Sequence, residues 1–172
     1  MQGFQILVAR SIGVICLGGA SIVSYASDID VPDGHLLKHS FSAEGVQIYE
    51  CNASTDGNFS WTFKAPEARL FGSDGMVTVM HYAGPTWEAV GDKSKIVGQR
   101  VASSASATKN SIPQLLLSAK VLVNGEMFED IVYIQRLDTT GGSAPESGCD
   151  ANSSQIKVSV PYTARYNFFK KG

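Results

Sequence analysis

A histidine within an apolar segment is the first residue whose chemistry stands out. His81 lies in residues 76–82, MVTVMHY, and shares one face of an alternating strand with Val77 and Val79. An imidazole there could act as a general base or as a metal ligand. The alternative is a core histidine whose ring nitrogens are satisfied by backbone groups.

Two further candidates follow the break at Gly84-Pro85. Trp87 beside a turn could form a stacking platform for a sugar ring, and Glu88 could accept hydroxyl hydrogen bonds or act as an acid. The alternative is a core tryptophan next to a solvated glutamate. Trp61 is expected in the core, because it lies among alternating aromatic residues.

Arg136 lies in the apolar segment 131–137. If the alternate apolar residues of this segment face inward, Arg136 does too, and a buried guanidinium requires a carboxylate. Glu50 or Asp150 could supply it. A structural ion pair is the favoured interpretation, and recognition of an anion is the alternative. The expected ligand-binding residues are therefore Trp87, Glu88 and Arg136.

An enzymatic alternative uses the same residues. A secreted hydrolase could combine His81 with Glu88 or Asp150, and the two carboxyl groups could serve glycoside hydrolysis if their separation allowed it. The sequence contains no Gly-x-Ser-x-Gly elbow and no HExxH motif, so serine hydrolases and zincins lack their signatures. His81, Glu88 and Asp150 are thus catalytic candidates without an assigned reaction.

Metal and modification sites have weaker support. His35 and His39 are four residues apart, a spacing that suits a metal on a helix, but this segment has no other helical feature. We expect no metal site and no cofactor. Asn52, Asn58 and Asn152 begin Asn-x-Ser triplets, which are glycosylated only in a eukaryotic secretory pathway.

The first 26 residues are typical of a signal peptide. Arg10 is the one charge, an apolar run spans residues 12–23, and small side chains place cleavage after Ala26. This run is shorter than the roughly 20 apolar residues of a transmembrane helix. A permanent N-terminal anchor is the alternative, and Cys16 lacks the preceding small residue of a lipoprotein site. We expect an exported protein, periplasmic or extracellular, without stable membrane insertion after cleavage.

Composition limits the partners of the expected single domain, residues 27–172. The full chain has 172 residues and a formal net charge of −2. Its basic residues are scattered, which argues against a nucleic-acid partner and a polybasic membrane surface. The remaining partner class is a small molecule or carbohydrate, and the oligomeric state stays open.

Two cysteines remain after cleavage, Cys51 and Cys149. In an exported protein they most simply pair, and a bridge across such a long loop is worth about 4–5 kcal/mol in the chain-entropy model. A reactive or metal-binding thiol pair is the alternative, but CxxC spacing is absent.

Period-two patterns dominate the elements that must position these residues. Apolar residues alternate with polar ones over residues 156–168, which predicts a long strand packed on a core, with an edge or bulge at Pro161. Asn124-Gly125 predicts a hairpin with a type I′ turn, and residues 65–69 a short turn. The chain is expected to form an all-β fold, an antiparallel sandwich or barrel of about eight to ten strands with little helix.

Several stretches resemble the secreted family called domain of unknown function 3455, found in bacteria and fungi. The resemblance covers residues 31–169 and rests on GVQIYEC at 45–51, FSWTFKAPEA at 59–68, HYAGPTWEA at 81–89, YIQRL at 133–137, GCD at 148–150 and VPYTA at 160–164. It implies that Cys51 and Cys149 are the family's cysteine pair, and it implies no activity. Some fungal relatives carry a malate dehydrogenase label, but this chain has no GxGxxG unit for a dinucleotide. Gln114 departs from the aromatic residue expected there.

The leading functional hypothesis is a non-enzymatic exported module that binds a small molecule, a sugar or a cell-wall component. The hydrolase is the alternative, and a structural or protein-binding role is the third possibility.

Overall fold

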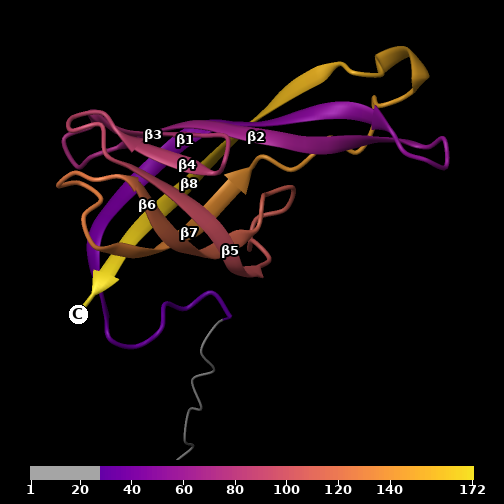
Figure 1. Ribbon diagram of the computed structural model, residues 1–172. Coiled ribbons are helices and arrows are strands. Elements are labelled where there is room, and N and C mark those ends of the chain that lie inside the picture. The colour runs from indigo at the N-terminus through magenta and orange to yellow at the C-terminus, as the bar shows by residue number, and fades with distance from the viewer. Residues whose placement is uncertain (1–27) are drawn as a thin grey trace, which may run out of the picture.

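The computed structural model describes residues 28–172 (Figure 1). The expected signal peptide, residues 1–26, lies outside the described residues. Eight strands form one antiparallel sheet in which each strand pairs with the next, and β8 pairs with β1 to close a barrel. The strands are β1 (His35–Ala53), β2 (Phe59–Phe71), β3 (Val77–Tyr82), β4 (Thr86–Ala89), β5 (Lys95–Ser104), β6 (Gln114–Val123), β7 (Ile131–Gly141) and β8 (Lys157–Lys171).

The predicted all-β fold is confirmed, and the closure selects a barrel over a sandwich. β1 runs for 19 residues and pairs with β2 along one edge and with β8 along the other. Closing the sheet in this way removes most of its open edges. The helical content of the described residues is one short 3-10 helix, η1 (Ala151–Ser153). Between residues 28 and 172 no helix is long and apolar enough to cross a membrane.

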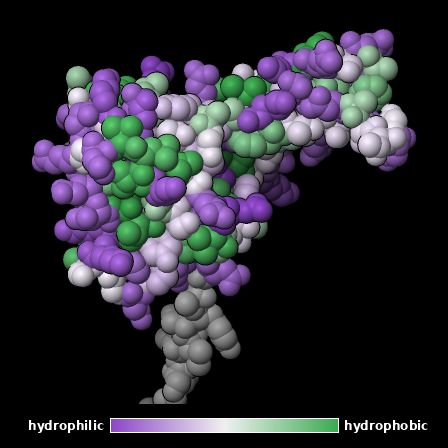
Figure 2. Space-filling view, in the orientation of Figure 1, coloured by the Kyte–Doolittle hydropathy of each residue, from purple (hydrophilic) through white to green (hydrophobic). Residues whose placement is uncertain are grey.

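β1, β2 and β8 continue past the other strands as a three-stranded arm that projects from the barrel body (Figures 1 and 2). The disulfide Cys51–Cys149 lies on this arm and joins residues 98 positions apart, with a Cα–Cα distance of 5.3 Å. It ties β1 to the segment that leads into η1. The predicted pairing is therefore confirmed, and a disulfide is compatible with an exported protein.

The alternation predicted for the last strand is confirmed where β8 lines the barrel, because its buried apolar residues there follow period two, although Asn167 between them is buried as well. Its inward side chains are Tyr162, Ala164, Tyr166 and Phe168. Ile156 precedes the strand on the arm and is 51% exposed. β8 pairs with β7 only from Tyr162 onward, so Pro161 has β1 as its one neighbouring strand. The predicted edge at Pro161 is thus present.

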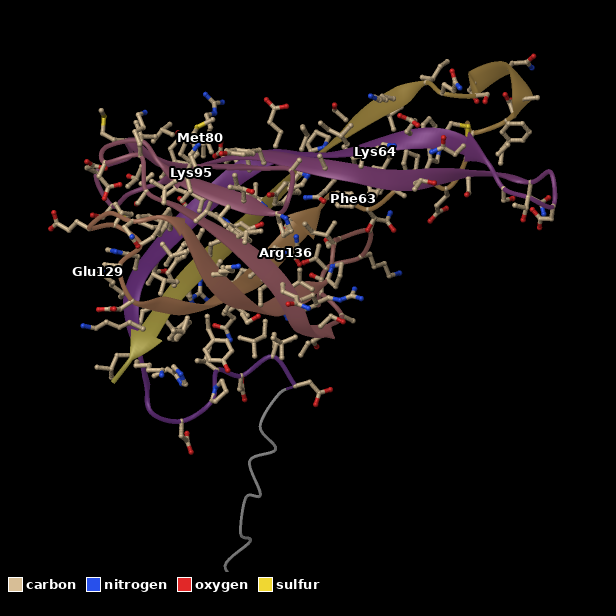
Figure 3. The ribbon with its side chains drawn as sticks, viewed as in Figure 1. Phe63, Lys64, Met80, Lys95, Glu129 and Arg136 are labelled. Carbon is tan, nitrogen blue, oxygen red and sulfur yellow. A yellow bond between two sulfur atoms is a disulfide. The ribbon has the colours of Figure 1, made fainter. Side chains whose placement is uncertain are left out.

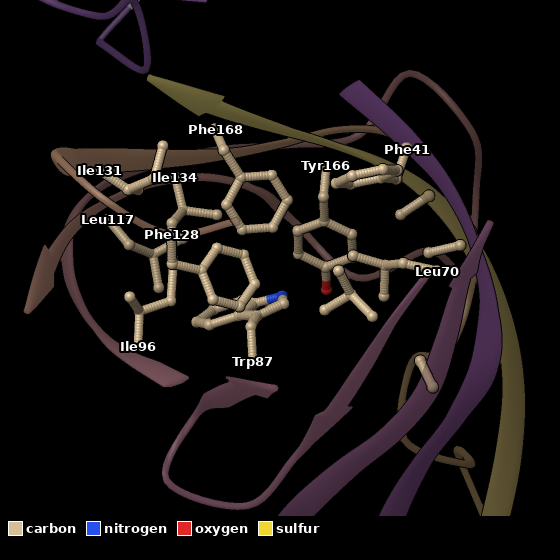
Figure 4. Close-up of a cluster of buried hydrophobic side chains, with 14 of the residues drawn as sticks. Phe41, Leu70, Trp87, Ile96, Leu117, Phe128, Ile131, Ile134, Tyr166 and Phe168 are labelled. Carbon is tan, nitrogen blue, oxygen red and sulfur yellow. The ribbon is translucent and has the colours of Figure 1, made fainter. Parts of the chain in front are cut away.

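An aromatic and aliphatic core fills the end of the barrel away from the arm (Figure 4). Phe128, from the connection between β6 and β7, is fully buried there against the Phe168 ring, at 5.5 Å between ring centroids. Its aromatic members are Phe41, Trp87, Phe128, Tyr162, Tyr166 and Phe168, and its aliphatic members include Leu70, Ile96 and Ile134. The core closes this end and leaves the arm end for a cavity.

The predicted type I′ turn at Asn124-Gly125 is wrong. β6 ends at Val123 and β7 begins at Ile131, and neither Asn124 nor Gly125 has a positive φ. The connection is longer because it turns Phe128 into the barrel. Gly125 is needed for a different reason, since a Cβ added there would lie 2.7 Å from the Cβ of Ser94.

The predicted turn at residues 65–69 is also wrong. β2 continues through this segment, with a register shift opposite Ile48 and Tyr49 of β1. Ala68 and Leu70 are buried against the core, so the extended backbone is held by packing on the barrel interior.

Candidate functional site

A cavity of about 580 Å³ opens at the arm end of the barrel. Small-molecule sites commonly have volumes of roughly 300–1,000 Å³, and an eight-stranded barrel is wide enough for one small ligand. All eight strands contribute to the wall. The lining residues are Gln47, Tyr49, Phe63, Lys64, Pro66, His81, Gly84, Pro85, Trp87, Arg100, Ile112, Pro113, Leu115, Leu117, Arg136 and Tyr166.

His81 and Trp87 form one wall of this cavity. They are cross-strand neighbours on β3 and β4, and their rings stack with centroids 4.2 Å apart and planes 10° from parallel. Tyr166 of β8 meets both rings edge-on, at 5.4 Å from His81 and 5.8 Å from Trp87. Figure 4 shows Trp87 and Tyr166 next to one another within the cluster of buried side chains. The structure therefore brings two of the candidate residues, His81 and Trp87, into contact.

His81 is neutral at pH 7. Burial lowers its pKa to about 3, the hydrogen bond to Thr86 partly opposes this, and the nearby charge of Arg136 makes a smaller lowering contribution. Nδ1 lies 2.9 Å from the carbonyl oxygen of Thr86. Because a carbonyl only accepts, Nδ1 carries the proton and Nε2 is left as an acceptor. A ring with this pKa is a weak general base at neutral pH.

Arg136 lies inside the barrel, 8% exposed, and lines the same cavity. Its Nε and Nη2 atoms donate to the carbonyl oxygen of Pro113 at 3.1 and 2.8 Å. The predicted ion pair of Arg136 with Glu50 or Asp150 is wrong. Glu50 faces outward and binds Lys64 and Lys157, and a backbone carbonyl takes the place of the expected carboxylate.

The cavity wall is cationic. None of its lining residues is acidic, and Arg136, Arg100 and Lys64 contribute positive charge. Lys64 lies 3.5 Å from Glu50, whereas Arg100 forms no ion pair within residues 28–172. In Figure 3, Arg136 lies inside the ring of strands, and Lys64 lies along β2.

Two buried N–H donors of the wall have no hydrogen-bond partner, Nε1 of Trp87 and Nε2 of Gln47. The Gln47 side chain lies near the Tyr162 hydroxyl. Burial, with a contribution from Tyr166, raises the pKa of that hydroxyl, and the interaction with Gln47 opposes the rise. The indole N–H has no such contact. Buried donors without partners are uncommon in folded proteins and indicate a place for a polar atom.

Gln47, Tyr49 and Tyr166 were not singled out as site residues from the sequence. Counting back in steps of two from the buried Cys51 gives Tyr49 and Gln47, so the strand period carried a signal for both. The Tyr49 hydroxyl donates to the carbonyl oxygen of Gly142 at 2.7 Å. Gly142 has a φ of 85° and no room for a side chain, because an added Cβ would lie 2.8 Å from that of Tyr162.

Glu88 lies on the outer face of the barrel. It is the cross-strand neighbour of Met80, and its Oε2 atom accepts from the Tyr82 hydroxyl at 2.8 Å and lies 3.1 Å from Lys95. The hydrogen bond from Tyr82, followed by that from Lys95, lowers the pKa of Glu88. The structure does not bring Glu88 to His81.

Asp150 lies on the arm, next to the disulfide. Its Oδ1 atom accepts from the backbone N–H groups of Asn152 and Ser153 and caps η1. The hydrogen bond from the Ser153 side chain, with those two backbone bonds, lowers the pKa of Asp150. Among the described residues, the grouping of His81 with Glu88 or Asp150 is therefore not assembled.

His35 and His39 make backbone contacts at the other end of β1. His35 Nδ1 lies 2.8 Å from the Pro32 oxygen, and His39 Nε2 lies 2.9 Å from the Met127 oxygen. No group of three or more His, Cys, Asp or Glu side chains in residues 28–172 could hold a metal ion.

Comparison with known proteins gives one finding. A family model described as protein of unknown function (DUF3455) matches residues 32–170, which confirms the resemblance noted from the sequence motifs. No curated protein and no solved structure matches the chain.

Proposed function

The chain belongs to the family of proteins of unknown function DUF3455, which assigns it no activity, and we propose that it is a non-enzymatic module that binds one small, largely apolar molecule at the arm end of its barrel. The observation that carries this proposal is the cavity of about 580 Å³ into which all eight strands place side chains. The indole N–H of Trp87, which has no hydrogen-bond partner among the described residues and belongs to the same wall, supports it.

An apolar ligand body fits the composition of the wall. Most of the lining is aromatic or aliphatic, and burying such a surface against a ligand yields about 25 cal/mol for each Å² removed from water. The residues concerned are Tyr49, Phe63, Pro66, Pro85, Trp87, Ile112, Pro113, Leu115, Leu117 and Tyr166. A small number of polar groups among them, including Arg136 and Gln47, would orient the ligand.

A small molecule fits this site better than a sugar stacked on Trp87. The Trp87 side chain is 1% exposed, and the His81 ring covers one of its faces. A sugar ring would have to displace His81 in order to stack there. This arrangement supports binding within the barrel over recognition of an extended glycan at Trp87.

The placement of the titratable groups supports binding over catalysis. His81 is neutral and stacked, while Glu88 and Asp150 belong to a surface ion pair and a helix cap. General acid and base catalysis requires such groups within hydrogen-bond reach of one substrate.

Export is part of the same proposal. The Cys51–Cys149 bridge favours an oxidising compartment, and the expected leader would direct the chain there. Mass spectrometry of protein from its native host should find residues 27–172 with the bridge intact. Free sulfurs or an attached leader would contradict export.

Binding can be tested with a neutral fluorescent probe, N-phenyl-1-naphthylamine, whose emission rises in apolar sites. Leu115 and Leu122 lie on the same strand, β6, but Leu115 lines the cavity and Leu122 is 54% exposed. Leu115→Trp should fill the cavity and abolish the rise, while Leu122→Trp should keep it. Oligosaccharides are titrated in parallel as competitors.

Equal probe binding by the two variants would place the probe outside the barrel and contradict the proposed site. If an oligosaccharide displaces the probe from the unmodified chain, and its binding is lost in Leu115→Trp, the natural ligand of the cavity is a carbohydrate and the proposal of an apolar ligand is wrong.

A further inference from the structure

We propose that the molecule held in this cavity is an organic anion, whose carboxylate binds the Arg136 guanidinium and whose aromatic or aliphatic body lies against the apolar lining, which includes Phe63 and Leu115. This inference rests on the proposed function and deepens it, because it names the chemical class of the ligand.

The Arg136 guanidinium has N–H donors that form no hydrogen bond within the described residues. Nε and Nη2 donate to a single acceptor, the Pro113 carbonyl oxygen, and Nη1 forms no hydrogen bond to any residue of 28–172. Arginine presents five N–H donors in a planar fork that matches the two oxygens of a carboxylate. The Pro113 carbonyl therefore orients this fork without neutralising it.

A buried charge is normally paired, because leaving water is costly for an ion. Arg136 is buried, and Glu50, one of the two acidic partners considered for it, pairs with Lys64 and Lys157 instead. No side chain within residues 28–172 forms an ion pair with it. A ligand carboxylate would supply the missing negative charge in a site where few water molecules compete for the guanidinium.

The other residues of the cavity wall also favour a negatively charged ligand. Arg100 adds a cation that forms no ion pair within residues 28–172, whereas Lys64 is paired with Glu50. No acidic residue lines the cavity, and His81 is neutral and does not repel an anion. The indole N–H of Trp87 is a further donor without a partner. Donors outnumber acceptors around the cavity, as expected for recognition of an acceptor-only group such as a carboxylate.

The test compares two ligands of nearly the same shape, 1-naphthylacetate and its neutral primary amide, 1-naphthylacetamide. Calorimetric titration of the intact chain at pH 7 and low salt should show the acid binding about tenfold or more tightly than the amide, since hydrogen bonds to charged groups are the stronger ones. Arg136→Gln should remove that preference while retaining the binding of the amide. Lys120→Gln removes the same charge from the outer face of β6 and should leave the preference unchanged.

The outcomes separate this inference from the proposed function. Equal affinity for acid and amide, or a preference that survives Arg136→Gln, overturns the anion assignment and leaves the binding module in place. Binding of N-phenyl-1-naphthylamine without either naphthyl ligand overturns the anion assignment as well. Failure of all three ligands to bind overturns both.

Arg136→Gln could also lose its fold, which circular dichroism and the amide titration would reveal. In that case the inference is tested by the ratio of the affinities of the unmodified chain for the acid and the amide. Arg100→Gln is measured beside it, and its preference for the acid should be smaller but still present. An unmodified chain without an acid preference contradicts the inference whatever the variants do.

Discussion

Arg136 donates from both Nε and Nη2 to one backbone oxygen, that of Pro113, at 3.1 and 2.8 Å. The segment around Pro113 is itself anchored, because the Ile112 carbonyl accepts from the Thr139 hydroxyl at 2.6 Å and the Ile112 N–H donates to Gly141 at 2.9 Å. The guanidinium is therefore oriented before any ligand arrives. Such preorganisation lowers the entropy lost on binding.

Gly98 sets the depth of the cavity beside Trp87. A Cβ added at Gly98 would lie 2.9 Å from Cζ3 of Trp87 and 3.0 Å from Cδ2 of Leu117. Gly98→Ala should push the indole toward the ligand, weaken probe binding several-fold and cost about 1–3 kcal/mol of stability. Gly91→Ala is the matched control, because nothing lies within 4 Å of its added Cβ. Urea denaturation and probe titration measure both effects, and identical behaviour of the two variants would contradict this packing.

The buried His81 should make stability depend on pH. Its pKa is about 3 in the folded chain and 6.5 in the unfolded one, so the unfolded chain binds more protons between these values. The free energy of unfolding is therefore highest above pH 6.5 and should fall by roughly 2 kcal/mol from pH 7 to pH 5 on account of this group. Urea titrations across that range measure the slope.

The control for this prediction is a second histidine. His81→Gln should flatten the pH dependence, whereas His35→Gln should keep it. His39, whose pKa burial also lowers, contributes in the same direction and remains in both variants. An unchanged slope in His81→Gln would show that His81 titrates normally and is more accessible than the structure indicates.

The disulfide should stabilise the fold without shaping the cavity. It closes a loop of 98 residues, for which the chain-entropy model gives about 4–5 kcal/mol. Replacing Cys51 and Cys149 together by serine should lower the free energy of unfolding by up to this amount, and probe affinity in the folded variant should stay the same. Urea unfolding of the oxidised chain with and without reductant checks the first part. Insensitivity to reductant would contradict a stabilising bridge.

Glu88 should be dispensable for binding. It points away from the cavity and pairs with Lys95 on the outer face, where ion pairs contribute little. Glu88→Gln should therefore leave probe affinity and the affinity for 1-naphthylacetate unchanged, with a small shift in melting temperature. A large loss of affinity would move the site to the outer face of β3 and β4 and would revive Glu88 as a functional residue.

Sequence reasoning predicted the parts of the fold that alternation and cysteine pairing determine. The inward residues of β8, among them Tyr166 and Phe168, follow from period two, and the Cys51–Cys149 bridge follows from two thiols in an exported chain. The same period also implied that Trp87 and Glu88, as neighbours on one strand, point to opposite faces. Treating them as one ligand-binding pair overlooked that signal.

Other features depend on contacts that no local pattern carries. The acceptor for Arg136 is the backbone carbonyl of Pro113. Every residue offers such a carbonyl, so the sequence could not identify this one. The connection after β6 follows the burial of Phe128 in the core, which outweighs the turn preference of Asn124-Gly125. Closure into a barrel depends on β1 pairing with β8, the two strands farthest apart in the sequence.

The chain has two tryptophans, and their indole N–H groups give the most direct test of the central claim, that an organic anion binds inside the barrel. Trp61 Nε1 donates to the Ser147 oxygen at 2.9 Å on the arm, whereas Trp87 Nε1 has no partner and belongs to the cavity wall. In a ¹H–¹⁵N spectrum, assigned with Trp61→Phe, saturating 1-naphthylacetate should shift the Trp87 indole signal and leave the Trp61 signal in place. A Trp87 signal that does not move while calorimetry reports binding, or a shift confined to Trp61, would contradict the account.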